Sequence, residues 1–74
     1  MVWYLMYSLY KTKSGGYCII NDKTRFVLNS TRDKYKAVLI CSALNKDILT
    51  EFEVSSITDV NELINLYKIR VRGD

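Results

Sequence analysis

With 74 residues, the chain is long enough for one domain and too short for two, so residues 1–74 are expected to form a single small globular domain. Hydrophobic residues make up 49% of the chain and charged residues 26%, a balance that excludes an intrinsically disordered protein. The chain contains no histidine, the most common general base and zinc ligand, so we expect no enzyme, no cofactor and no metal site.

The net charge of +3 conceals an uneven distribution along the chain. Residues 1–46 contain eight lysines and arginines against two aspartates, a net charge of +6, whereas residues 47–74 contain three basic and six acidic residues, a net charge of −3. Such asymmetry bears on which partners the protein attracts, and it says nothing about the fold.

Residues 2–11 are rich in aromatic and branched side chains, which is typical of a β-strand. Both alternating sets of side chains are apolar: one contains Tyr4 and Tyr10, the other Trp3 and Tyr7. Because a two-layer fold covers only one face of a sheet, one of these pairs is expected to be exposed and to form an association surface, for a partner or for a homodimer. A sheet curled into a small barrel would instead bury both sets.

The same run of residues argues against a membrane protein. It is about half the ~20 residues that a membrane-spanning helix needs, and it lacks the basic start of a signal peptide. We therefore expect no membrane association.

Two further strands are expected at residues 17–20 and 24–29. A loop at residues 12–16 contains two glycines, and the Asn-Asp-Lys sequence at 21–23 suits a tight turn. Together with the first strand, these segments predict a three-stranded antiparallel meander.

Residues 32–45 are expected to form a helix, with Ser30 or Thr31 as its N-cap. Helical spacing places Ala37, Val38, Cys41 and Leu44 on one face, with Ile40 at its edge. The apolar run within residues 34–44 is equally compatible with a buried strand, and the alanines and the cap favour the helix.

Residues 48–55 alternate between apolar and polar side chains and predict a fourth strand, with Glu51 and Glu53 pointing together toward solvent. A second helix is expected from Thr58 or Asp59, with Asp59 and Glu62 at the spacing of a capping box. After Tyr67 the period changes: either the helix continues to Val71, or residues 67–72 form a short C-terminal strand, which the alternation slightly favours.

The expected fold class is therefore α+β, with a small antiparallel sheet packed against two helices in the order β-β-β-α-β-α and a short C-terminal strand as an optional addition. The residues expected in the core are Val38, Cys41, Leu44, Ile48, Phe52, Val54, Leu63 and Ile64. A Phe52→Ala substitution is accordingly expected to cost about 3–5 kcal/mol.

Cys18 and Cys41 lie far apart in the sequence, each within an apolar run. A secreted domain of this size would usually contain several disulfides, so two buried free thiols in a reducing cytoplasm are expected. A single disulfide between them is the alternative.

Aromatic residues near lysines and arginines suggest a surface that binds either a protein or single-stranded nucleic acid. This candidate interaction surface consists of Trp3, Tyr4, Tyr7, Tyr10, Lys11, Lys13, Lys23 and Arg25. A second, acidic candidate surface consists of Asp47, Glu51, Glu53, Asp59 and Glu62.

The leading hypothesis is a non-catalytic protein-binding module that docks on or inhibits a larger macromolecule, because a protein partner can use both charged poles. The alternative is a small single-stranded nucleic-acid-binding domain that stacks bases on Tyr and Trp within a Lys/Arg rim. In size and in its abundance of Asn, Lys, Ile and Tyr, the chain resembles small accessory proteins of phages or mobile elements. That resemblance covers no motif and implies no functional residue.

Overall fold

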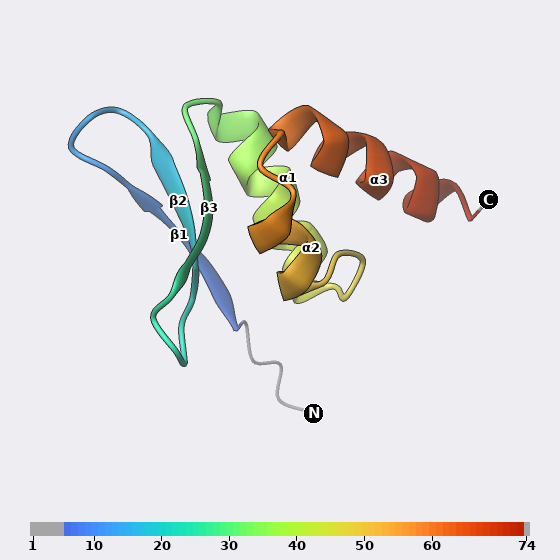
Figure 1. Ribbon diagram of the computed structural model, residues 1–74, viewed down its shortest axis with the longest axis horizontal. Coiled ribbons are helices and arrows are strands. Elements are labelled where there is room, and N and C mark those ends of the chain that lie inside the picture. The colour runs from blue at the N-terminus through green and yellow to red at the C-terminus, as the bar shows by residue number, and fades with distance from the viewer. Residues whose placement is uncertain (1–5, 74) are drawn as a thin grey trace.

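The structure is a computed structural model that describes residues 6–73. It consists of a three-stranded antiparallel sheet and three helices, so the α+β class is confirmed. All three helices lie on one side of the sheet, and no other element of residues 6–73 covers the opposite face, which we call the uncovered face (Figure 1). The sheet is open, so the barrel alternative is wrong.

The strands are β1 (Tyr7–Lys11), β2 (Tyr17–Asn21) and β3 (Val27–Thr31), in the order β1-β2-β3. The predicted meander is therefore confirmed, although β3 begins three residues later than expected. Residues 22–26 form the connecting turn, in which Arg25 takes a left-handed conformation with φ of 66°. The part of the expected first strand at residues 2–5 lies outside the described residues.

The first helix, α1 (Lys34–Asn45), confirms the helical interpretation of this segment. Its N-cap is Asp33, whose side chain accepts a hydrogen bond from the backbone N–H of Lys36 at 3.1 Å, in place of the expected Ser30 or Thr31. The buried residues of α1 are Ala37, Ile40, Ala43 and Leu44.

Val38, expected in the core, is 46% exposed. Residues 37–41 are all apolar, so the sequence left open which side of the helix faces inward. The structure places the inward face about a quarter turn from the predicted one. Cys41, also expected in the core, is only half-buried for the same reason.

Residues 51–56 form a second helix, α2 (Glu51–Ser56), so the predicted strand at 48–55 is wrong. Thr50 and Glu53 form a complete capping box: the Thr50 hydroxyl accepts from the Glu53 N–H at 3.2 Å, and the Glu53 carboxylate accepts from the Thr50 N–H at 2.9 Å. These reciprocal bonds satisfy two backbone donors that only a helix start leaves unpaired, and the helix forms despite the alternating pattern.

The third helix, α3 (Val60–Arg72), has Asp59, one of the two predicted starts, as its N-cap, and Gly73 with a left-handed φ of 77° as its C-cap. The short C-terminal strand is therefore wrong, and the element order is β-β-β-α-α-α. The apolar residues Ile69 and Val71, whose alternation with basic residues favoured a strand, are both exposed. They lie at the end of α3, which extends away from the sheet (Figure 1).

The core lies between the sheet and the helices. Its residues are Ile19, Ile40, Ala43, Leu44, Leu49, Val54, Leu63 and Ile64. Of the residues expected there, Leu44, Val54, Leu63 and Ile64 are buried, and Ile48 packs against the cluster from its edge. Phe52 is 77% exposed, because in a helix it points away from the side on which Val54 is buried. The expected destabilisation by Phe52→Ala therefore does not apply.

Candidate functional site

The residues of the candidate interaction surface do not share one face of the molecule. Tyr7 packs against the core, whereas Tyr10 lies on the uncovered face of the sheet. Lys13 lies in the β1–β2 loop, and Lys23 and Arg25 lie in the β2–β3 turn at the opposite end of the strands. Trp3 and Tyr4 lie outside the described residues, and Lys11 ends β1 on the side of the sheet that faces the helices.

The residues of the candidate acidic surface are also separated. Asp47 lies in the loop after α1, where it takes a left-handed conformation with φ of 60°, and Asp59 accepts from the Asn61 N–H at 2.9 Å as the N-cap of α3. Glu62 is exposed in the first turn of α3. Glu51 and Glu53, expected to point together, lie on different sides of α2, since two residues are about 200° apart on a helix.

Glu53 forms a two-pronged ion pair with Arg70. Arg70 donates from Nη1 to Oε1 at 2.7 Å and from Nη2 to Oε2 at 2.5 Å, and Nη1 also donates to the Ile48 carbonyl at 2.9 Å. The hydrogen bond from Arg70, followed by the one from the Thr50 N–H, lowers the pKa of Glu53 to about 2. This pair fastens α3 to the start of α2.

We expect the Glu53→Gln variant to be less stable than the wild type at neutral pH and to approach it as the pH falls from 5 toward 2. A lowered folded-state pKa contributes stability above the ordinary value of 4.5 and loses it as the pH falls through about 2. Urea unfolding of both proteins at several pH values measures the difference. In an Arg70→Gln background most of this pH dependence should disappear; if it is unchanged there, the ion pair is not its cause.

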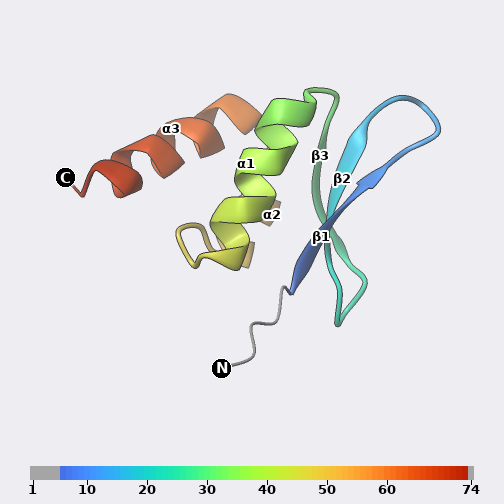
Figure 2. The ribbon, with the colours of Figure 1, turned by 180° about the vertical axis from the view of Figure 1, so that it is seen from behind.

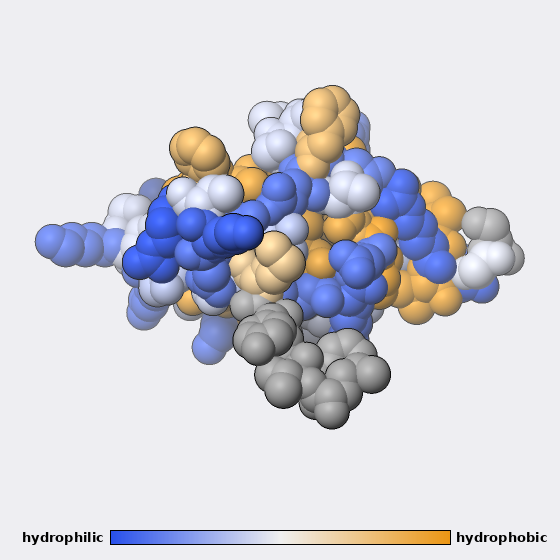
Figure 3. Space-filling view, turned by 90° about the horizontal axis from the view of Figure 1, so that it is seen from below, coloured by the Kyte–Doolittle hydropathy of each residue, from blue (hydrophilic) through white to orange (hydrophobic). Residues whose placement is uncertain are grey.

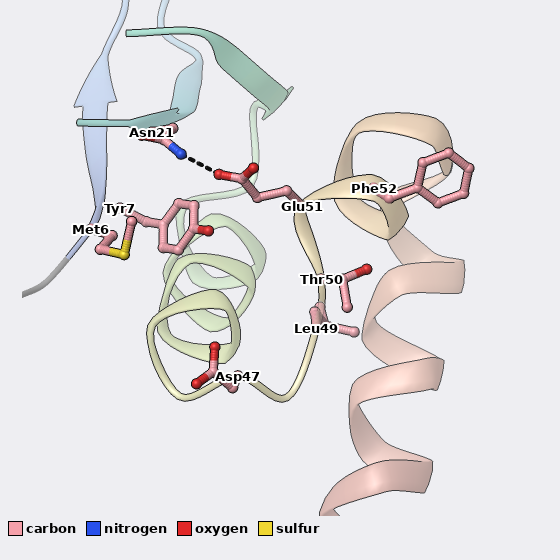
Figure 4. A pocket seen from close by; sticks show the side chains of 8 residues that line it. All are labelled: Met6, Tyr7, Asn21, Asp47, Leu49, Thr50, Glu51 and Phe52. Atoms are coloured by element: carbon pink, nitrogen blue, oxygen red, sulfur yellow. Dashed lines mark hydrogen bonds between the residues drawn. The ribbon is translucent and has the colours of Figure 1, made fainter. Parts of the chain in front are cut away.

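On the other side of α2, Glu51 lines a pocket of about 500 Å³ near the start of β1 (Figure 4). We call this pocket the Glu51 pocket. Its lining residues are Met6, Tyr7, Asn21, Asp47, Leu49, Thr50, Glu51 and Phe52. Asn21, the buried polar residue of β2, donates from Nδ2 to Glu51 and accepts at Oδ1 from the N–H groups of Lys23 at 2.9 Å and Thr24 at 3.1 Å. Asn21 and Glu51, two polar residues of the lining, are thus bonded to each other.

Tyr7 completes this cluster, and its ring lies between β1 and Glu51 (Figure 4). Burial, then the hydrogen bond with Glu51 and the negative charges of Glu51 and Asp47, raises the pKa of Tyr7 to about 12. The phenol therefore stays protonated at neutral pH, and the cluster serves to hold β1, the β2–β3 turn and α2 together.

A larger groove, which we call the β1–α1 groove, lies between β1 and α1. It has a volume of about 990 Å³ and a largely apolar lining. Its lining residues are Tyr7, Ser8, Leu9, Val38, Cys41, Ser42, Asn45 and Lys46. The two elements that form it run beside each other on the side of the molecule that Figure 2 shows.

The β1 side of this groove is an edge of the sheet, because among residues 6–73 only β2 pairs with β1. At Tyr7 the side chain of Asn45 makes the two hydrogen bonds that a neighbouring strand would make. Its Oδ1 accepts from the Tyr7 N–H at 3.1 Å, and its Nδ2 donates to the Tyr7 carbonyl at 3.2 Å. Beyond Tyr7, the edge continues past Leu9 to Lys11. An exposed strand edge beside an apolar groove is a typical place for another chain to bind.

Both cysteines are free thiols, as expected, but the expected burial is wrong, because both are only half-buried. Their side chains lie on different sides of the sheet. Cys18 belongs to β2, and its side chain lies on the uncovered face of the sheet, whereas Cys41 lines the β1–α1 groove. Burial, followed by the charge of Asp22, raises the pKa of Cys41. Its thiol is therefore protonated at neutral pH and is a poor nucleophile.

Figure 3 shows the molecule from below Figure 1. Hydrophilic residues cover most of the surface at the sheet end, and apolar surface is visible near the middle.

No cluster of three or more potential metal ligands occurs within residues 6–73. In the same part of the chain, no helix combines the length and apolar character needed to cross a membrane. Comparisons with models of protein families, with curated proteins and with solved structures found no match.

Proposed function

We propose that this protein is a non-catalytic protein-binding module that docks on a larger macromolecule through the β1–α1 groove. The observation that carries the proposal is the position of Val38, an exposed valine on α1 that faces the free edge of β1 across an apolar groove. Contiguous exposed apolar surface on a small protein usually marks a contact site.

Two features of the groove support a protein partner. The groove has a volume of about 990 Å³, and its lining combines apolar side chains with the polar groups of Ser42, Asn45 and Lys46. Protein-binding sites of this kind have an apolar centre and a polar rim. The nucleic-acid alternative has less support, because its basic residues in the β1–β2 loop and the β2–β3 turn lie at opposite ends of the sheet.

We expect peptides selected from a random displayed library to bind the wild-type protein, and to bind Val38→Gln at least about tenfold more weakly. Glutamine introduces a polar side chain into the groove without adding charge. Val71→Gln is the matched control: it is an exposed valine on a helix, at the end of α3 and outside the groove lining.

Titration calorimetry gives the affinities, and thermal unfolding shows whether both variants remain folded. Equal loss of binding in both variants, or a library that gives no binder, contradicts the proposal.

A further inference from the structure

A small pocket lies at the end of the sheet where the β1–β2 loop meets the junction of β3 and α1, and we call it the loop-end pocket. We infer that it binds a phosphate group. The pocket has a volume of about 290 Å³ and shares no lining residue with the β1–α1 groove, so this inference is independent of the proposed function. Its lining residues are Thr12, Ser14, Gly16, Tyr17, Cys18, Ser30, Thr31 and Arg32.

Strand pairing brings the two sides of the loop-end pocket together. Tyr17 in β2 pairs with Lys11 in β1 and with Thr31 in β3, so the β1–β2 loop and the end of β3 lie side by side. The loop is held by its own hydrogen bonds. The Thr12 N–H donates to the Gly16 carbonyl at 2.8 Å, and the Gly16 N–H donates to the Thr12 hydroxyl at 2.9 Å. The loop side of the pocket therefore has a defined shape.

The side chains of the lining offer hydrogen-bond donors to a ligand. The Thr31 hydroxyl accepts from a backbone N–H at 3.2 Å, which leaves its own proton to donate. The hydroxyls of Thr12 and Ser14 are 3.1 Å apart and share one of their two protons, so the other can be donated. The Ser30 hydroxyl and the Arg32 guanidinium make no hydrogen bond within residues 6–73. A ligand with several acceptor oxygens would satisfy these donors.

The charges around the pocket favour an anion. The lining contains no acidic residue and includes Arg32. Lys11 and Lys13 flank it on the side of the loop, and Lys34 flanks it at the start of α1. Asp33 is the one acid in this part of the sequence, and its carboxylate already accepts a backbone N–H as the N-cap of α1. An anion in the pocket therefore meets positive charge and no carboxylate of the lining.

A phosphate group matches both the donors and the charge. A phosphate monoester carries a charge of about −1.5 to −2 at pH 7 and has three strong acceptor oxygens. A guanidinium binds two of these oxygens through parallel hydrogen bonds, and hydroxyls can donate to the third. The volume of about 290 Å³ is well above the ~30 Å³ that one water molecule occupies in the liquid, so the group has room.

Inorganic phosphate is the first probe, titrated at constant ionic strength with chloride as the balancing anion. We expect saturable changes in the amide signals of Gly16, Thr31 and Arg32 in two-dimensional NMR spectra of the protein. Arg32→Gln should weaken binding at least about tenfold, because it removes the charge-assisted hydrogen bonds. Ser30→Ala removes one neutral donor and should weaken binding about two- to tenfold.

Arg72→Gln is the matched control, because it removes the same charge from an exposed arginine at the end of α3, outside the lining. Its phosphate affinity should stay within about twofold of the wild type, since a distant exposed charge is screened by salt. Equal losses in Arg32→Gln and Arg72→Gln, or signal changes that never saturate, overturn the inference. The spectra of the free variants show directly whether each is folded.

Two further probes distinguish the source of the phosphate. Phenyl phosphate carries a monoester, and a thymidine dinucleotide carries one phosphodiester of the nucleic-acid type. We expect the monoester to bind at least as tightly as inorganic phosphate and the diester to bind more weakly, because the diester has less charge. Tighter binding of the diester that still depends on Arg32 identifies a nucleic-acid backbone as the source and supports the phosphate site. Binding of neither probe overturns it.

Discussion

The Ile40→Ala variant is expected to lose about 2–5 kcal/mol of unfolding free energy, the range measured when a large aliphatic side chain is removed from a protein core. Ile40 is 0% exposed and lies on the face of α1 that packs in the core with Ile19 and Leu63. Domains of this size rarely have more than about 3–5 kcal/mol in total, so much of the population should be unfolded at room temperature.

Urea unfolding followed by circular dichroism measures this effect. Phe52→Ala is the control, because Phe52 is a larger side chain but is exposed, and its removal should change stability by less than about 0.5 kcal/mol. Equal losses in the two variants would show that the helices are packed differently from the structure described above.

The Asn21→Leu variant is expected to cost about 2–3 kcal/mol, although leucine is similar in size and more hydrophobic. Asn21 is only 5% exposed, and its side chain bonds Glu51, the Lys23 N–H and the Thr24 N–H. A leucine removes these three hydrogen bonds: the two from backbone groups contribute about 0.5–1.5 kcal/mol each, and the bond to the charged Glu51 about 1.5–3 kcal/mol. The change in urea midpoint gives the total effect.

Hydrogen exchange locates the damage, which should appear at the β2–β3 turn and at the start of α2. The control is Asn61→Leu, since Asn61 is exposed and bonds the Lys36 ammonium group at 2.7 Å on the surface. Its expected effect is within about 0.5 kcal/mol. If Asn21→Leu is equally mild, the turn does not depend on this side chain.

The meander and the two longer helices could be predicted from the sequence because each depends on a local pattern: turn residues between strands, and apolar spacing along a helix. The short helix α2 was missed because only Val54 is buried in it, so it shows no helical period. The Thr-x-x-Glu spacing of Thr50 and Glu53 was the available signal, and the alternation of residues 48–55 outweighed it.

The candidate site was harder to predict, because it depends on contacts between distant parts of the chain. Asn45 meets Tyr7 across 38 residues, and Asn21 meets Glu51 across 30. No local pattern indicates these pairings. The sequence predicted an association surface on one face of the first strand, and that remains a prediction. It could not show that the edge of this strand and the neighbouring helix line a groove.

Asn45 also has a consequence for how the protein avoids aggregation. Open sheet edges allow identical chains to add strands one after another, and proteins keep such edges short. Here the last residue of α1 covers part of the edge, so the helix end and the sheet edge depend on the same side chain. Local fraying of that helix end would lengthen the exposed edge to include Tyr7. The stability of the last turn of α1 therefore sets how much of the strand edge is open to another chain.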